Sequence, residues 1–284
     1  MKKKRLIFSL GVITLALCLT SCGKPSKKLN QAELVEEINK FYRNNQINAT
    51  VKFSGSTLYI YVPLENLFVI KDKPKINTVN FNVEKVDGVY KNADFDFNYL
   101  INKLSKPEKK SQPYDLDEKA SKIMQRAAYT VAYKLMNTDA NISFIVEAYA
   151  DINLGIILTS IRYLPDIKKF FCGVLPFEEY NKRVFQDVIE SKSVIQDKSG
   201  ESINYQDITL GDFLSKQIAQ RIRLLFSQNY KINRPIKKEI ELIIRETLNS
   251  YKFKDYLLVQ IKDVAEDGVT LLSRTEIEKK IKKQ

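Results

Sequence analysis

The sequence predicts an α+β protein in which helices precede antiparallel β-hairpins. Apolar residues recur at helical spacing in 31–45, 115–136 and 236–248, and each of these segments is followed by two runs of alternating apolar and polar residues around a short turn. This order, found three times, is the main evidence for the fold class. The residues of the three units align poorly, so the repeat is either architectural or a coincidence.

The first unit lies near the N-terminus. Its helix carries an apolar face, and the turn Ser54-Gly55-Ser56 separates strands at Val51–Phe53 and Leu58–Val62. Less regular strand-like stretches follow at Thr78–Val83 and Asp94–Tyr99. The helical face consists of Leu34, Val35, Ile38, Phe41 and Tyr42.

The second and third units follow the same order. The helix over 115–136 precedes strands at Asn141–Ala150 and Gly155–Tyr163. Pro235 opens the third helix, a position that tolerates proline, and strands follow at Tyr256–Lys262 and Val269–Leu272. A capping box, Ser273-Arg274-Thr275-Glu276, predicts a short final helix with a lysine-rich end. That basic end is either a solvated helix terminus or a contact for an anionic surface.

A segment rich in Lys, Pro and Ser, 103–113, divides the chain. We expect it to be a linker between an N-terminal α+β module, 30–102, and a C-terminal α+β module, 114–284. The C-terminal module contains a mainly helical insert, 176–228, which begins at Pro176 and includes a second helix over 209–227.

The N-terminus carries an export signal. Basic residues Lys2–Arg5 precede an apolar stretch from Leu6 to Leu19, and the small residues Thr20 and Ser21 precede Cys22. A helix needs roughly 20 apolar residues to cross a bilayer, so these 14 residues are too short for a permanent span. They have the length of a signal-peptide core.

This order resembles the signal of bacterial lipoproteins, although the rest of the chain resembles no family. The resemblance implies a signal peptide over 1–21, cleavage before Cys22 and lipidation of its thiol, with 22–29 as a flexible tether. Several acyl chains would anchor the protein stably to the outer face of a bacterial membrane, and to the outer membrane in a diderm cell. The alternatives are a secretory signal with an incidental cysteine, or an uncleaved anchor.

Composition excludes several function classes. The chain has no histidine, which removes Ser-His-Asp and Cys-His catalysis and histidine metal sites. Lipidation of Cys22 would leave Cys172 without a disulfide partner, and we expect Cys172 to be a buried thiol. The net charge of +12 falls to +8 without the four basic residues of 1–21 and is spread along the chain. We therefore expect no nucleic acid, metal or cofactor.

Two groups of polar residues are candidates for a site. Glu147 and Asp151 share a strand face that can pair with Arg162, and such carboxylates could serve an exported hydrolase of cell-wall or glycan substrates. Tyr59 and Tyr61 could stack on a sugar or peptide, or pack under a helix. The preferred interpretation is a non-enzymatic binding or assembly module for an envelope protein or cell-wall polymer, and the hydrolase is the alternative.

Overall fold

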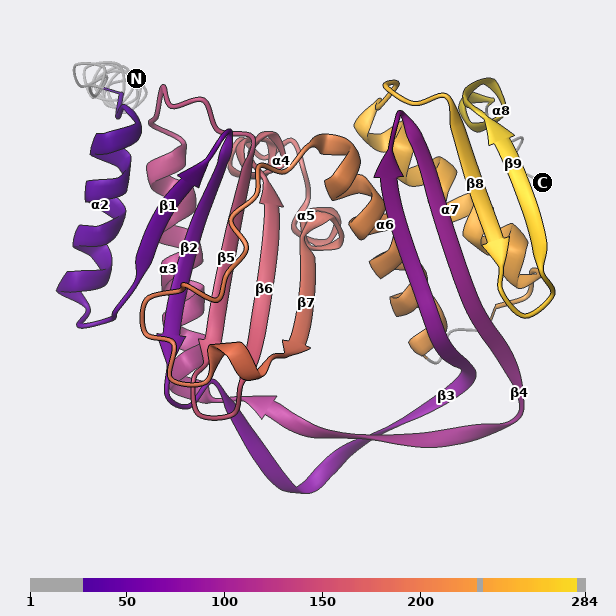
Figure 1. Cartoon of the computed structure of the whole chain (residues 1–284), viewed down its shortest axis with the longest axis horizontal. Helices are drawn as coiled ribbons and strands as arrows, with labels where there is room; N and C mark the ends of the chain where they lie inside the picture. The colour runs from indigo at the N-terminus through magenta and orange to yellow at the C-terminus, as the bar shows by residue number, and fades with distance from the viewer. Residues whose placement is uncertain (1–27, 229–231, 280–284) are drawn as a thin grey trace, which may run out of the picture.

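The computed structural model describes residues 28–228 and 232–279, which form two β-sheets with helices between and beside them (Figure 1). The first sheet in this part of the chain has five strands. In spatial order they are β1 (Thr50–Ser54), β2 (Thr57–Leu64), β5 (Phe144–Asp151), β6 (Ile156–Tyr163) and β7 (Phe185–Glu190). Strands β2 and β5 are parallel and all other neighbours are antiparallel.

The second sheet repeats this arrangement with four strands in the described ranges. In spatial order they are β3 (Phe68–Lys91), β4 (Asp94–Leu116), β8 (Leu258–Asp263) and β9 (Gly268–Ser273). Here β4 and β8 form the parallel pair that joins two hairpins. Each sheet is therefore built from hairpins that lie far apart in the sequence.

The predicted α+β class and the helix-then-hairpin order are confirmed. Helix α2 (Gln31–Asn44) precedes β1 and β2, α3 (Glu118–Leu135) precedes β5 and β6, and α7 (Ile236–Tyr251) precedes β8 and β9. The capping box at Ser273 is also present and begins the short helix α8 (Arg274–Glu278).

Helices α2 and α3 cover one face of the first sheet. Their apolar positions pack on alternate residues of β2 and β5, such as Leu58, Ile60 and Ile145, which are almost completely buried. A sheet face and an amphipathic helix both need a partner surface, so this packing removes both apolar faces from water.

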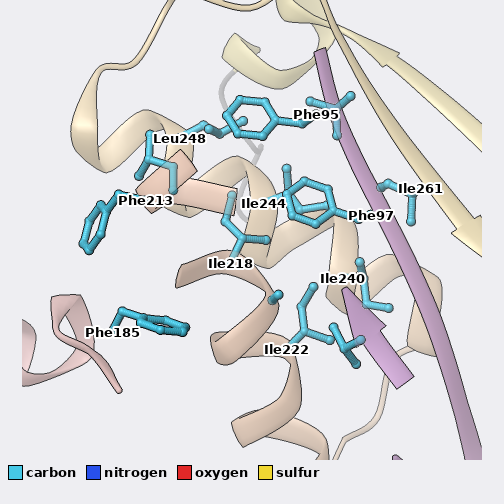
Figure 2. Close-up of a cluster of buried hydrophobic side chains, with 14 of the residues drawn as sticks. Phe95, Phe97, Phe185, Phe213, Ile218, Ile222, Ile240, Ile244, Leu248 and Ile261 are labelled. Carbon is cyan, nitrogen blue, oxygen red and sulfur yellow. The ribbon is translucent and has the colours of Figure 1, made fainter. Parts of the chain in front are cut away.

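A second core begins on the opposite face of the first sheet and continues to the second sheet. Helix α6 (Leu210–Ser227) lies at its centre, with α7 beside it (Figure 2). Phe213 of α6 packs against Phe144 of β5, with ring centroids 5.3 Å apart, while Ile222 lies in the same cluster as Phe97 of β4. One continuous core thus holds the two sheets together.

Polar side chains of α6 also form hydrogen bonds with backbone groups at the edges of both sheets. The side-chain oxygen of Gln220 accepts a hydrogen bond of 2.8 Å from the N–H of Gln186 in β7. Arg223 donates a hydrogen bond of 2.9 Å to the carbonyl of Val86 in β3. These bonds satisfy strand groups that have no strand partner on that side.

The backbones of α6 and β3 approach closely at Gly88. A Cβ atom at this position would lie 2.6 Å from the carbonyl oxygen of Ser215 in α6. Because the neighbouring atom belongs to the backbone, a larger residue would have to displace the helix. Glycine at this position therefore allows α6 to lie directly against the strand.

The hairpin of β3 and β4 is much longer than the sheet to which it belongs. Strand β4 pairs with β8 only from Asp94 to Tyr99, and beyond Tyr99 it pairs with β3 alone as a two-stranded ribbon. The two ends of the ribbon meet beside the first sheet, where the N–H of Asp117, just after β4, donates to the carbonyl of Leu67, just before β3 (Figure 1). Its register shifts three times, as expected for a twisted, bulged ribbon.

The expected linker and modules differ from the observed structure. Residues 103–113 lie inside β4, where Lys103 and residues 108–112 pair with β3 instead of forming an irregular connection. The segments 30–102 and 114–284 are not separate units, because β2 pairs with β5 and β4 pairs with β8 across the expected boundary. Local periodicity predicted the hairpins but carries no information on which hairpins pair with each other.

The expected insert over 176–228 is less helical than predicted. It includes α5 (Phe177–Arg183) and α6, but also β7, which completes the first sheet. Helix α4 (Leu164–Phe171) precedes it, and the short 3-10 helix η1 (Lys192–Val194) follows β7.

Candidate functional site

Of the two carboxylates that the sequence placed within reach of Arg162, Glu147 forms the pair, at the centre of the first sheet. Residue Glu147 lies opposite Ser160 in the β5–β6 register, so Arg162 is its diagonal neighbour on the same face. A guanidinium nitrogen of Arg162 lies 2.5 Å from a carboxylate oxygen of Glu147, and both side chains are less than a tenth exposed. The sheet face that carries them is buried under α3, not solvated.

Neighbouring groups hold this ion pair in place. Arg162 donates a hydrogen bond of 3.3 Å to the carbonyl of Ala128 in α3, and the hydroxyl of Tyr149 lies 3.5 Å from Glu147. Burial by itself would lower the pKa of Arg162, but Glu147, Tyr180 and Tyr149 together outweigh burial and raise that pKa. Burial raises the pKa of Tyr149 well above its usual value, so its hydroxyl is a neutral donor.

Asp151, the other candidate carboxylate, accepts hydrogen bonds from backbone N–H groups. One oxygen accepts hydrogen bonds from the N–H groups of Leu67 and Phe68, and the other accepts from Asn153 and Leu154. These four bonds fix the turn after β5 and the start of β3. Asp151 thus has a structural role at the point where the ribbon leaves the first sheet.

A second buried ion pair was not predicted from the sequence. Arg183 of α5 lies 3.1 Å from Asp166 of α4 and 2.8 Å from Glu179, and its guanidinium stacks over the ring of Tyr251 in α7. Gln217 of α6 donates to the hydroxyl of the same tyrosine. The spacing of Glu179 and Arg183 by four residues was the available sequence signal.

Tyr59 and Tyr61 are covered and cannot stack on a ligand in this structure. Both rings are at most 5% exposed, and their hydroxyls donate to the carbonyls of Gln206 and Asp197. The loop over 195–208 lies across this face. The tyrosines thus attach the loop to the sheet.

The same loop is organised by Asp197. One carboxylate oxygen accepts from the N–H groups of Ser199 and Gly200, and the other accepts from the N–H and hydroxyl of Ser202. Desolvation by itself would raise the pKa of Asp197, but these hydrogen bonds lower it below its usual range.

The candidate residues line none of three cavities that open on the described surface. A cavity of about 360 Å³ lies beside the start of α7, and one of about 200 Å³ lies beside the ribbon and Ser227. The third, of about 380 Å³, lies between the ribbon and the first sheet. The last is mainly apolar and is lined by Phe68, Tyr114, Asp115, Leu116, Leu158 and Val188.

The remaining sequence predictions concern Cys22, Cys172 and the tether. Cys172 is exposed, so the expectation of a buried thiol is wrong; it follows the last turn of α4, where the chain meets solvent. Cys22 and the signal segment lie outside the described residues. The end of the expected tether is ordered, because Leu29 hydrogen-bonds with Asn137 and Asp139.

Over residues 28–228 and 232–279, no group of three or more His, Cys, Asp or Glu side chains could hold a metal ion. No helix in the same ranges has the length and apolar character needed to cross a bilayer. Comparisons with family models, with characterised proteins and with solved structures found no match to this chain.

Breaking the buried ion pair on one side should destabilise the protein strongly. Replacing Arg162→Met leaves Glu147 as an unpaired buried charge, and we expect the free energy of unfolding to fall by about 3–5 kcal/mol. The double variant Arg162→Met with Glu147→Leu should lose less unfolding free energy than either single variant, because it leaves no unpaired buried charge. Urea denaturation measures all three, and a double variant as unstable as the sum of the singles would contradict this role.

An exposed pair provides the control for that series. Glu118 and Lys122 are 2.5 Å apart on α3 with side chains that are mostly exposed. Because solvent screens such pairs, Lys122→Met should change the free energy of unfolding by only about 0.5 kcal/mol or less.

The loop carboxylate should contribute a measurable pH dependence. Because the pKa of Asp197 is lowered on folding, its stabilisation is present above about pH 4 and is lost as the pH falls below that value. We expect the unfolding free energy of Asp197→Asn to fall less steeply in this acid range than that of the wild type. Urea denaturation at a series of pH values tests this, and equal slopes would count against it.

Proposed function

We propose that this protein is a lipid-anchored, non-enzymatic binding or assembly module on the outer face of a bacterial membrane. The support for the anchor is the order of basic residues, a short apolar stretch and small residues before Cys22. The support for a binding role is that both candidate carboxylates, Glu147 and Asp151, are buried and already satisfied by other groups.

A hydrolase that uses two carboxylates needs both of them at an open cleft on either side of the substrate bond. Glu147 is neutralised by Arg162 beneath α3, and Asp151 holds four backbone N–H groups. Neither residue lines any of the three cavities. We therefore place the function on the surface and not in the interior.

The ribbon of β3 and β4 offers the surface best suited to a partner. It runs from one sheet to the other (Figure 1). Its apolar side chains at Val69, Ile70 and Ile76 are exposed. Strand β4 adds exposed lysines at positions 103, 106, 109 and 110, against a single acidic residue in the same stretch, Glu108. We propose that this basic stretch of the ribbon contacts an acidic envelope protein or an anionic cell-wall polymer.

Neutralising the ribbon should weaken capture of the partner. In cells, photo-crosslinking from the ribbon should trap one defined partner, and changing Lys103, Lys106 and Lys109 to Gln should reduce its yield. The matched control changes Lys192, Lys198 and Lys254, which are also exposed, to Gln and alters the net charge equally. Equal loss in both variants would argue against the ribbon, and hydrolysis of a cell-wall glycan that Glu147→Gln abolishes would overturn the binding function.

The anchor has a separate test. Replacing Cys22→Ser removes the thiol that would carry the lipid, so lipid labelling should be lost and the protein should be released from the membrane or remain unprocessed. Labelling with a fatty-acid analogue and membrane fractionation measure this. Unchanged labelling and retention would refute the lipid anchor, whereas Cys172→Ser should leave both intact.

A further inference from the structure

The two sheets have four edge strands in the described ranges, and helix α6 covers two of them. A backbone N–H of strand β7 donates a hydrogen bond to Gln220 of α6, and the strand carries two acidic residues, Asp187 and Glu190. Strand β3 is covered by the close approach of α6 and by Arg223. Proteins usually prevent unwanted strand pairing at a sheet edge by covering the edge with a helix or loop, or by placing charged side chains on it.

Strand β1, the third edge, is also protected. The hydroxyl of Thr50 donates to the carbonyl of Ser199, and the hydroxyl of Ser54 donates to the carbonyl of Tyr205. Both acceptors belong to the loop over 195–208. The strand in addition carries a lysine, Lys52, at its centre.

Strand β9 has none of these protections. It contains no charged residue and no proline, and within the described residues it pairs on one side only, with β8. Val269 and Leu271 are 52% and 55% exposed, and both lie on the sheet face opposite to buried Leu272. An uncharged edge with two exposed apolar side chains is suited to accepting another strand.

We propose that β9 pairs in antiparallel fashion with β9 of a second copy of this chain, which joins the two second sheets into one. Thr270 of each copy would lie opposite Thr270 of the other, on the two-fold axis. In this register Val269 of each copy lies opposite Leu271 of the other, on the same face. Two exposed apolar pairs are thereby removed from water.

Charge supports a second copy as the occupant of this edge. The same register brings Glu266, in the turn before β9, to the end of the pairing where Arg274 of the other copy begins α8, and both residues are exposed. The two-fold axis repeats this opposite-charge contact at the other end. Pairing of β7 with itself would instead bring together two acidic strands.

Self-association of the full chain in detergent tests the proposal, which does not depend on the proposed function. Sedimentation equilibrium should show a reversible dimer. Leu271→Lys introduces a charge at the centre of the paired edge and should weaken the dimer by about tenfold or more. Val188→Lys is the matched control, since Val188 lies on edge strand β7 and is equally exposed at 55%, and it should leave the dimer intact.

A crosslink tests the register. In a Cys172→Ser background, Thr270→Cys should form a disulfide-linked dimer, because directly opposed residues of antiparallel strands have Cα atoms within disulfide range. Thr50→Cys on edge strand β1 should not. The proposal is overturned if the wild type stays monomeric at high concentration, if both lysine variants weaken the dimer equally, or if both cysteine variants crosslink equally.

Discussion

The packing of helix α6 between two sheets is the interaction on which the rest of the structure depends. Phe213 and Ile222 place it in a core that contains residues of both sheets, while Gln220 and Arg223 bind the backbone of one strand on each side. A helix that contributed only apolar contacts would leave two strand edges unsatisfied. Through α6, the two sheets share a single interior.

The order of the hairpins along the chain strengthens this dependence. The chain forms a hairpin of the first sheet, then one of the second, then returns to the first and finally to the second. Each sheet is completed by a parallel pairing, of β2 with β5 and of β4 with β8, between segments distant in sequence. Neither sheet can form from one continuous segment.

The sequence predicted the elements whose signals are local. The turn at Gly55 and the alternation after it identified β1 and β2. The alternation in the next hairpin indicated that Glu147 or Asp151 could pair with Arg162, but not that the pair is formed by Glu147 or that it is buried. Strand-like stretches were predicted inside β3 and β4, but residues 103–113 of the ribbon were missed. Strands that expose both faces need no apolar alternation, so Lys106 and Pro107 suggested a linker. The contact of Arg183 with Asp166 and the cover over Tyr61 depend on tertiary packing, which short spacings do not encode.

The position of β8 has a consequence for the order in which the chain can fold. Its partner β4 begins at Asp94, but β8 begins only at Leu258, so the central pairing of the second sheet must wait for nearly the whole chain. Until then, the β4 edge that β8 later covers is open to other strands. During synthesis from the N-terminus, β4 is therefore made well before the segment that completes its sheet.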